Sequence, residues 1–484
     1  MTGRYATVVL ASCLAGAALA EDMERAHAKI VARVEEGAFR TMAAQAKLRD
    51  RVKLTAYRPE TVNGTNTWGA ALQRALNEHE IVVIPAGARY WIEKPVVMPS
   101  NRRIEAKGAE VALLPGVCTL LLRNAHAEDG TLSPIPRKGR GANVAVVGGR
   151  WIDWVPGRRG YGRTGRFNEG ERRLGNFYGV STLFYFGNVD GVTVRNATFV
   201  HTGGFAVQAG DATDLVFENI VFERCYADGL HLNGNLEGVL ARNVRGSVGD
   251  DLVALNAYDW LNSSVNFGPQ RFVLCEDLEL AGESGYPAIR ILPAVFRYRD
   301  GREVDCAISD VIFRRVKGIT TFKMYLQTPP YRIGEAPEWG KVGSGGNLFF
   351  EDSAIDLKGP IDALPEYVKG DPVRGHFGVF EFGANLTSVY LRNLEVTFHA
   401  DRYPTSHLMT VGPKSSVPGK KREREVFDPY LSCRVGRVVL DGVRVRGVAP
   451  AELVHATSFK DVNGDGRSTG AGTIGEIVRS ANCP

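Results

Sequence analysis

Short strand patterns that recur every 23 to 41 residues predict that this 484-residue chain is an all-β solenoid, a parallel β-helix of about ten coils. Each copy is a five-residue run, such as Val192–Asn196, in which mainly apolar residues lead to a polar final residue. The copies end at Asn196, Asn219, Asn243, Asp277, Arg315, Asp352 and Asn393. Spacings of 23 and 24 residues between the first copies grow to between 34 and 41 residues later. The later coils are therefore predicted to carry inserted loops, which would wall a cleft.

The composition agrees with this fold and excludes several other classes of protein. Gly accounts for 55 of the 484 residues, which exceeds the roughly 7% of average proteins and indicates many turns. A hydrophobic content of 44% excludes a disordered chain. The net charge of +5 is too small and too dispersed to predict binding to nucleic acid, although it is compatible with an anionic ligand.

The N-terminus has the pattern of a secretory signal peptide. Residues 1–20 contain one Arg and an apolar stretch, and they end in the Ala18-Leu19-Ala20 cleavage pattern. The residues before Cys13 resemble a bacterial lipoprotein box, but the apolar run continues past Cys13, which favours simple cleavage over lipid anchoring. No later stretch reaches the length of a membrane span. The protein is therefore predicted to be secreted or periplasmic.

Three segments follow from these patterns. Residues 1–20 are the signal peptide, residues 21–58 a charged and Ala-rich helical segment, and residues 59–484 the β-helix domain. Within that domain, residues 67–77 have the pattern of a short amphipathic helix, which we expect to cover the N-terminal end of the solenoid.

The cysteines do not predict a disulfide framework or a zinc site. Six remain after the signal peptide, and they are expected to be buried thiols with one or two bridges. They are Cys118, Cys225, Cys275, Cys306, Cys433 and Cys483. No Cys-x-x-Cys pattern or Cys/His cluster is apparent in the sequence.

One loop imitates the start of an EF-hand. Asp461, Asn463 and Asp465 have the correct spacing, but position 12 of the loop is Gly472 where Glu is required. An Asx-rich turn is favoured over a structural Ca²⁺ site, and no other cofactor is predicted.

A ladder of polar residues is predicted on one face of the solenoid. Residues one coil apart lie directly above one another, about 4.8 Å apart. Tyr185, Gln208 and His231 follow one another at 23-residue intervals, and apolar residues flank each of them. The same flanking pattern surrounds three later residues, namely Arg290, Lys323 and Glu381. For Tyr185 and Gln208 a solvated polar face is the alternative interpretation.

The strongest functional pattern is a cluster of carboxylates. Asp228 is followed 22 and 23 residues later by Asp250 and Asp251, which is one coil period. We therefore expect the three carboxyl groups to meet on one face, where mutual repulsion raises at least one pKa. A protonated acid opposite an ionised base is what glycosidic cleavage requires.

These motifs resemble those of the family 28 glycoside hydrolases, the polygalacturonases and their relatives. Tyr226–His231 resembles the family's Asn-Thr-Asp-Gly-x-Asp, Asp250–Asn256 resembles its Asp-Asp-Cys-x-Ala-x-Asn, and Arg290–Leu292 resembles its Arg-Ile-Lys. The likeness implies a right-handed parallel β-helix and an inverting glycoside hydrolase of a polysaccharide or oligosaccharide. The family's Gly-His-Gly is absent and its final Lys is Leu292 here, so pectic or other uronate-containing polymers are only one class of candidate substrate.

The resemblance also implies roles for individual residues. Asp250 would protonate the leaving oxygen, while Asp228 and Asp251 would activate the attacking water. Seven residues are expected to contact substrate, by their place in these motifs or in the ladder. They are His231, Asn256, Arg290, Lys323, Gln208, Tyr185 and Glu381.

Two alternatives remain open at this stage. In a polysaccharide lyase of the same fold, the three Asp would bind Ca²⁺ and Arg290 or Lys323 would act as the base. In a non-catalytic carbohydrate-binding β-helix, the Asp-Asp pair would be dispensable. All three interpretations have a glycan as the partner of a chain that is expected to be monomeric.

Overall fold

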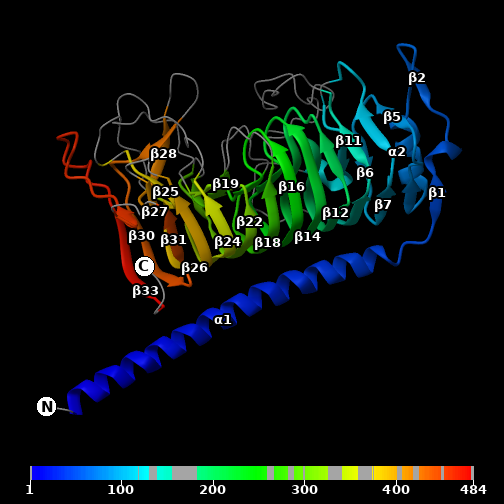
Figure 1. The fold of residues 1–484 in the computed structure, drawn as a ribbon. Coiled ribbons are helices and arrows are strands. Elements are labelled where there is room, and N and C mark those ends of the chain that lie inside the picture. The colour runs from blue at the N-terminus through cyan, green and yellow to red at the C-terminus, as the bar shows by residue number, and fades with distance from the viewer. Residues whose placement is uncertain are drawn as a thin grey trace.

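The chain forms an elongated solenoid of parallel strands, as the repeat predicts (Figure 1). The computed structural model describes residues 3–117, 119–129, 139–154, 182–258, 266–281, 288–297, 300–324, 341–357, 373, 375–399, 406–417, 424–447 and 452–480. In the described residues, successive coils pair in three parallel series, one for each side of the coil.

The first series, the helix-covered sheet, runs the whole length of the solenoid. Its strands are β1 (Arg51–Lys53), β4 (Ile81–Val83), β7 (Arg102–Glu105), β10 (Gly141–Val147), β12 (Thr182–Arg195), β14 (Phe205–Cys225), β16 (Leu236–Val248), β18 (Gln270–Leu280), β22 (Ile308–Lys317), β24 (Ser344–Asp356), β26 (Asn385–Phe398), β30 (Cys433–Asp441) and β33 (Gly472–Arg479).

The second series, the site sheet, carries the predicted ladder, and β12 and β14 bend so that they belong to both series. Its other strands are β6 (Val96–Met98), β9 (Leu122–Asn124), β15 (Leu230–Asn233), β17 (Val253–Asn256), β19 (Ala288–Leu292), β23 (Thr321–Lys323), β25 (Phe377–Phe382), β27 (Ser406–Val411) and β32 (Val454–Ala456).

The third series and the remaining elements complete the coils. The third series contains β3 (Thr65–Thr67), β5 (Arg89–Ile92), β8 (Glu110–Leu113), β11 (Arg150–Ile152), β13 (Thr198–Val200) and, near the other end, β31 (Arg444–Gly447). Three antiparallel hairpins involve β2 (Glu60–Val62) with β3, β20 (Ala294–Arg297) with β21 (Glu303–Cys306), and β28 (Lys414–Val417) with β29 (Arg424–Phe427). Short 3-10 helices are η1 (Leu54–Ala56) and η2 (Ala125–Asp129).

The interior is one apolar core built from stacked side chains. Cys275, Phe313 and Phe350 occupy the same position in three successive coils, and all three are at most 1% exposed. The rings of Phe313 and Phe350 stack with their centroids 5.8 Å apart. The inward-facing apolar side chains of each coil pack on those of the next coil. The core therefore continues along the solenoid without a second layer of secondary structure inside it.

The polar residues that end the predicted repeats form one corner of the coils. All seven have a positive φ, between 47° and 56°, which is the left-handed conformation that Asn and Asp tolerate best among residues with side chains. The amides of adjacent coils also bond to one another. Asn219 Nδ2 donates to Asn196 Oδ1 at 2.8 Å, and Asn243 Nδ2 donates to Asn219 Oδ1 at 2.7 Å. The final residue of each repeat is therefore explained by the left-handed turn, and the residues before it by the apolar core.

Replacement of Asn219 by Ala is expected to lower the free energy of unfolding by about 1–2 kcal/mol, since it loses two hydrogen bonds and places Ala at positive φ. Asn219→Gly loses the same bonds without the backbone strain and should be less destabilised. Denaturant unfolding of both variants separates the two contributions. Equal losses in the two variants would show that conformational strain is not what selects Asn here.

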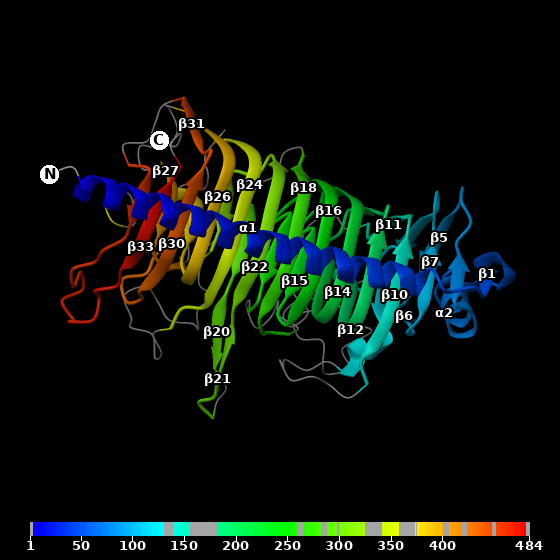
Figure 2. The same cartoon turned by 90° about the horizontal axis from the view of Figure 1, so that it is seen from below.

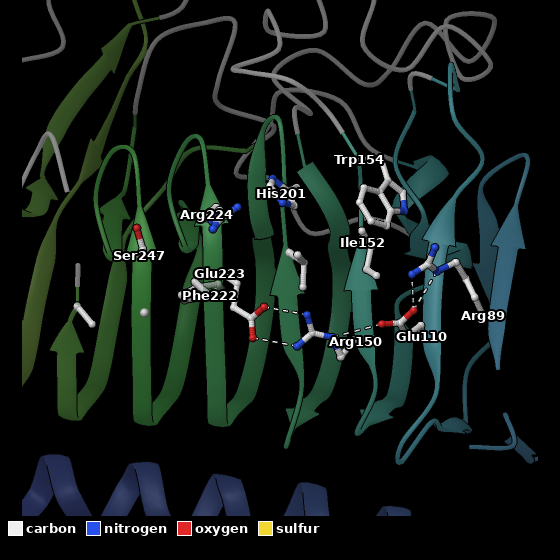
Figure 3. Close-up of a pocket in the computed structure, with 13 residues that line it drawn as sticks. Arg89, Glu110, Arg150, Ile152, Trp154, His201, Phe222, Glu223, Arg224 and Ser247 are labelled. Carbon is white, nitrogen blue, oxygen red and sulfur yellow. Dashed lines mark hydrogen bonds and ion pairs between the residues drawn. The ribbon is translucent and has the colours of Figure 1, made fainter. Parts of the chain in front are cut away.

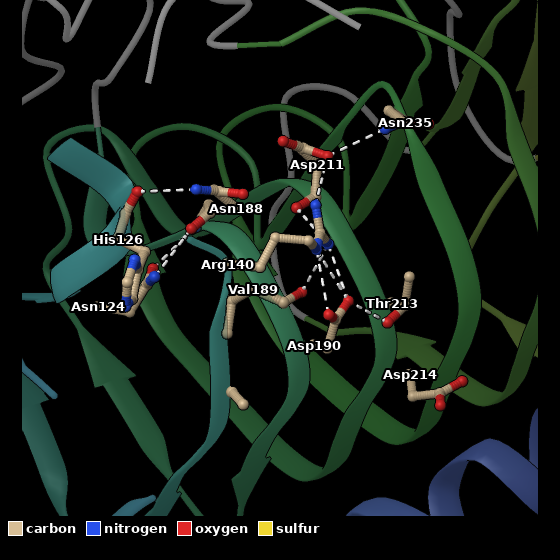
Figure 4. Close-up of polar contacts among 12 residues, drawn as sticks. Asn124, His126, Arg140, Asn188, Val189, Asp190, Asp211, Thr213, Asp214 and Asn235 are labelled. Carbon is tan, nitrogen blue, oxygen red and sulfur yellow. Dashed lines mark hydrogen bonds and ion pairs between the residues drawn. The ribbon is translucent and has the colours of Figure 1, made fainter. Parts of the chain in front are cut away.

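A second corner is held by an ion-pair cluster (Figure 4). Arg140 bonds to Asp190 at 2.9 Å and to Asp211 at 2.9 Å, and so links two successive coils. Asn235, in the next coil, donates to the same Asp211 oxygen at 3.0 Å. The φ values of Asp211 and Asn235 are 50° and 59°, so this corner uses the same left-handed turn.

A long helix, α1 (Gly3–Gln45), lies along the outside of the helix-covered sheet (Figures 1 and 2). It packs on a row of outward-facing apolar residues, one from each of seven successive coils and paired in register. The row is Val216, Leu240, Leu274, Ile312, Phe349, Tyr390 and Val439. Ile30 and Val34 of the helix are buried against this row, and Arg33 pairs with Asp214 at 2.8 Å. The helix is thus an integral strap of the solenoid.

The helical segment differs in extent from the predicted 21–58. The helix ends at Gln45, and residues 51–53 form β1, which pairs in register with β4. Strand pairing to the first coil overrides the local helical composition. The predicted helix at 67–77 is present as α2 (Gly69–Glu78), whose apolar face is buried. Among the described residues, no helix is long and apolar enough to span a membrane.

The described cysteines are free and buried, as expected for apolar thiols. Cys225, Cys275, Cys306 and Cys433 are not bridged. Burial raises the pKa of Cys225 to about 11 and the pKa of Cys306 to about 12, so these thiols are inert at neutral pH. These four free thiols leave Cys118 and Cys483 for at most one of the one or two expected bridges, and both lie outside the described residues.

Candidate active site

The predicted ladder lies in register on the site sheet. Successive strands place its members as direct neighbours in the order Tyr185, Gln208, His231, Ala254, Arg290, Lys323 and Glu381. The constant 23-residue spacing accounts for the first four, and the flanking apolar residues correctly locate the last three despite the inserted loops.

The ladder is buried, so the alternative of a solvated polar face is wrong for Tyr185 and Gln208. Both are 0% exposed, and Gln208 Nε2 donates to Asn233 Oδ1 at 2.8 Å. Lys323 and Glu381 are each 3% exposed. Glu381 is paired with Lys414 at 2.6 Å, and both side chains are buried.

The three predicted carboxylates meet where two adjacent coils enter the site sheet. Asp228 lies between β14 and β15, and Asp250 and Asp251 lie between β16 and β17, one coil later. One oxygen from each carboxyl group lies within 4.8 Å of the other two. Asp228 and Asp251 are 1% and 0% exposed, while the side chain of Asp250 is 15% exposed. Asp250 is therefore the carboxyl group that solvent reaches.

Glycines beside the carboxylates allow the coils to approach this closely. A Cβ on Gly229 would lie 2.5 Å from the Phe222 ring and 2.7 Å from the carbonyl oxygen of Leu252. A Cβ on Gly249 would lie 2.6 Å from the carbonyl oxygen of Tyr226. The Asp-Gly and Gly-Asp sequences therefore serve the stacking of the coils as well as the site.

His231 fixes the orientation of Asp228. Its Nδ1 lies 2.6 Å from Asp228 Oδ2, and its Nε2 lies 3.2 Å from the amide nitrogen of Asn233. The amide nitrogen of Asn233 can only donate, so His231 Nε2 accepts. The ring proton of His231 is therefore on Nδ1 and points to Asp228. Phe205 stacks on the imidazole at 3.7 Å. The second Asp228 oxygen accepts the backbone N–H of Asp251 at 3.3 Å, so both oxygens are held.

Arg290 lies between the other two carboxylates. Its guanidinium is 3.1 Å from Asp250 Oδ1 and 2.8 Å from Asp251 Oδ2. Burial raises the pKa of Asp251 well above its usual range despite the attraction of Arg290, which is the next largest effect. The negative charges of Asp250 and Asp228 raise this pKa further, while Lys323 opposes them. The site thus contains a carboxyl group that favours its protonated form.

Asn256 lies on β17, beside Asn233 of β15 and Leu292 of β19 in the register. It is fully buried. The predicted substrate residues therefore form two groups. Arg290 and His231 contact the carboxylates. The other five are buried along the same face, namely Tyr185, Gln208, Asn256, Lys323 and Glu381.

The carboxylate cluster has the donor set for a hard cation, but its positions are engaged by other groups. Carboxylate oxygens within 4.8 Å of one another suit Ca²⁺. Two of the three groups already contact the guanidinium of Arg290, and the third accepts from His231. A Ca²⁺ ion would have to displace a cation that is only 12% exposed.

The EF-hand-like loop satisfies its own carboxylates. Asp461 Oδ1 accepts the backbone N–H groups of Asp465 and Gly466 at 3.0 and 2.9 Å. Backbone N–H donors, that of Arg467 above all, hold the pKa of Asp465 well below its usual range. Asn463 donates to the Tyr430 hydroxyl at 2.8 Å. The loop has the hydrogen bonds of the Asx-rich turn that the sequence favours.

The sequence did not single out an aromatic groove on the neighbouring side of the coils (Figure 3). The groove has a volume of about 530 Å³, and Trp154, which is 43% exposed, stacks on His201 with centroids 6.1 Å apart. His201 in turn packs against Tyr226 at 6.4 Å, and Tyr226 is two residues from Asp228. Arg89 lies over the Trp154 ring at 5.0 Å. Only the one-coil spacing from His201 to Tyr226 was available in the sequence as a signal.

Comparisons with known proteins are limited to likeness of fold. No protein-family model matches the chain, and no curated protein matches its sequence significantly. The chain is similar to the family 28 exopolygalacturonase of Yersinia enterocolitica, with 11% identity, a TM-score of 0.45, and coverage of 90% of this chain and 79% of that one. It is similar to the endo-xylogalacturonan hydrolase of Aspergillus tubingensis, with 14% identity, a TM-score of 0.34, and coverage of 82% and 94%. It is also similar to PfbA, a surface adhesin of Streptococcus pneumoniae, with 11% identity, a TM-score of 0.38, and coverage of 85% and 93%.

Proposed function

We propose that the protein is a secreted glycoside hydrolase that cleaves a polysaccharide or oligosaccharide at the Asp228, Asp250 and Asp251 cluster. The observation that carries this proposal is the close contact of three carboxyl groups, one of which has a strongly raised pKa. Glycosidic cleavage needs one carboxyl group that donates a proton and another that accepts one, and the cluster supplies both. The motif resemblance to family 28 enzymes supports the same chemistry.

In the proposed mechanism the cluster carries one proton, which burial places on Asp251 in the free protein. A substrate that engages Arg290 weakens the hold of this cation on Asp250, and the proton transfers from Asp251 to Asp250. Asp250, the solvent-accessible carboxyl, then protonates the glycosidic oxygen as its bond to the anomeric carbon breaks. Water attacks that carbon and gives its proton to Asp251, assisted by Asp228, so the cluster ends with one proton.

Burial favours water, and not a carboxylate, as the nucleophile. Asp228 and Asp251 are 1% and 0% exposed, so neither reaches an anomeric carbon directly. A water that enters the site with the substrate and lies between these carboxyl groups and the sugar would lead to inversion of configuration. The three nearest oxygens lie within 4.8 Å of one another, closer than the roughly 6.5–9.5 Å between carboxyl groups that is usual for inverting enzymes. The anomer that appears first in a proton NMR time course therefore tests the assignment independently.

The substrate is proposed to extend from the cluster toward the aromatic groove. Trp154 is 43% exposed and offers an aromatic ring to the groove, and Tyr226 connects this side of the coil to Asp228. Arg290 is the cation that a uronate or sulfate group would meet at the cluster. Acidic glycans are therefore the first substrates to examine, with neutral glycans as the comparison.

Incubation of the full chain with plant and algal polysaccharides is expected to release reducing ends without the ultraviolet absorbance of an unsaturated uronate. Asp250→Asn should reduce the rate by about 10²–10⁴-fold, since it removes the proton donor. A folded Asp250→Asn protein with wild-type activity would contradict the proposal.

A polysaccharide lyase is the alternative with a structural observation in its favour, the Ca²⁺-compatible arrangement of the three carboxylates. Release of unsaturated uronate in a Ca²⁺-dependent reaction would establish it. A third outcome is tight glycan binding without cleavage, unaffected by Asp250→Asn, which would identify a binding protein.

A further inference from the structure

Three histidines from three successive coils meet at the C-terminal end of the site sheet. His376 directly precedes β25, His407 lies on β27 and His455 on β32. One ring nitrogen of each lies within 4.8 Å of the other two. His376 and His455 stack with centroids 3.6 Å apart, and His376 Nδ1 lies 2.6 Å from His407 Nε2. This convergence of imidazoles lies outside the carboxylate cluster.

Glu452 orients two of the three rings from behind. Its backbone carbonyl oxygen is 2.6 Å from His407 Nδ1, and its carboxylate is 3.2 Å from His455 Nδ1. Each Nδ1 therefore carries the proton, and each Nε2 presents a lone pair to the space among the rings. Metal-binding histidines have this arrangement, in which a carbonyl or carboxylate accepts from the ring nitrogen that does not bind the metal.

One of these lone pairs has no partner in the described part of the chain. His455 Nε2 is buried there without a hydrogen bond. His407 is 5% exposed. Imidazole nitrogens whose lone pairs point into the same space are positioned to bind a cation.

The surrounding charges do not oppose a cation at this position. Lys414 is the nearby positive group, and its ammonium donates to the carbonyl oxygen of His376 at 3.3 Å. The same ammonium is neutralised by Glu381 at 2.6 Å, and the pair is buried. The carboxylate of Glu452 leaves the immediate surroundings of the rings with a net negative charge.

We propose that His376, His407 and His455 form a zinc-binding site. Imidazole is a preferred ligand of Zn²⁺, and three histidines with water in the fourth position make a complete tetrahedral set. Zn–N bonds of about 2.0–2.1 Å separate tetrahedral ligand nitrogens by about 3.4 Å, so the 2.6 Å His376–His407 contact must open by under about 1 Å. When the metal binds His376 Nδ1, the proton that this nitrogen shares with His407 Nε2 moves to His376 Nε2, so that the ring stays a neutral imidazole.

The proposed zinc would tie β25, β27 and β32 together at one end of the site sheet. His455 continues the ladder, four strands beyond Arg290 in the order Lys323, Glu381, Thr410 and His455. At about 4.8 Å for each strand, His455 lies about 19 Å from Arg290. The zinc site is thus structural in position and separate from the carboxylate cluster.

Zinc titration of the full chain, stripped of metal with a chelator, is expected to show one tight equivalent for each chain. Co²⁺ in its place should give the intense visible absorption of a tetrahedral nitrogen site. His455→Gln should abolish the tight equivalent, and Glu452→Gln should weaken it by about 10–100-fold. His399→Gln is the matched control, because His399 pairs with Asp356 on the exposed surface and should bind zinc as the wild type does.

Two further variants keep the test decisive. His376→Gln alters one of the two partly exposed members of the site, and its circular dichroism should match the wild type. Asp250→Asn should retain the zinc equivalent. Loss of zinc in Asp250→Asn but not in His376→Gln would place the metal at the carboxylates and overturn the proposal. The absence of a tight equivalent in a folded wild-type chain would overturn it as well.

Discussion

Asp251→Asn is expected to abolish glycan cleavage and, at the same time, to raise the free energy of unfolding at neutral pH. Asp251 is fully buried, and its pKa is raised well above its usual range, chiefly by burial. Folding therefore favours the protonated carboxyl group over the ionised one. Stability from this group is present at low pH, below the pKa of the unfolded chain, and is lost as pH rises through the raised folded pKa. Asn cannot ionise and avoids that loss.

The expected stability gain is about 1 kcal/mol at pH 8 and vanishes near pH 4, while the rate of cleavage falls by about 10²–10⁴-fold. Denaturant unfolding at both pH values and a reducing-end assay measure the two effects. Asp277→Asn provides a control of opposite sign, since the hydrogen bond and ion pair with Arg315 hold the pKa of Asp277 below its usual range. That variant should lose a little stability at neutral pH and keep its activity. A wild-type stability profile in Asp251→Asn would contradict the proposed protonation state.

The register of the site could be predicted from the sequence because one coil period maps directly onto space. Asp228 and Asp251 are 23 residues apart, so parallel pairing places them side by side whatever the rest of the chain does. Gln208 and His231 pair for the same reason. Arg290 follows an inserted loop, so the 23-residue spacing does not predict its place in the ladder. The apolar residues on either side of Arg290 predict that place instead, because they identify the segment as a strand of the solenoid.

The contacts that depend on loop length could not be predicted in this way. The buried Lys414–Glu381 pair joins residues 33 positions apart, and the three histidines are separated by 31 and 48 residues. None of these three spacings equals the 23- or 24-residue period of the first coils, because the later coils carry insertions. Such residues become neighbours only once every strand of the site sheet is in place.

The row of apolar residues beneath α1 could not be predicted for a different reason. Each coil contributes a single outward apolar residue to the row beneath α1, and one apolar residue on a polar face carries no signal by itself. The row is visible only after the register stacks seven such residues. Ile30 and Val34 of the helical segment pack on this row, but no pattern in the sequence predicted a contact between the helix and the solenoid.

Arg290→Gln is expected to have the opposite effect on stability from Asp251→Asn, with a larger magnitude. It removes the cation that lies between Asp250 and Asp251, while Lys323 remains as an attractive charge for Asp251. Breaking a buried ion pair from one side costs about 3–5 kcal/mol. Because the missing cation lets the pKa of Asp251 rise further, the loss should grow as pH rises from 4 to 8 and should be small at the acid end.

The double variant Arg290→Gln/Asp251→Asn separates this electrostatic cause from lost packing. If charge repulsion dominates, the second substitution restores most of the stability at pH 8, since it removes one of the two carboxylates. Arg437→Gln is the matched control, because it breaks an exposed pair with Glu476 and should cost less than about 1 kcal/mol at either pH. A loss in Arg290→Gln that is the same at pH 4 and pH 8, and that the double variant does not relieve, would mean that Arg290 supports the coil by packing. The cluster would then hold no proton for Arg290 to control, and the proposed transfer from Asp251 to Asp250 would fail with it.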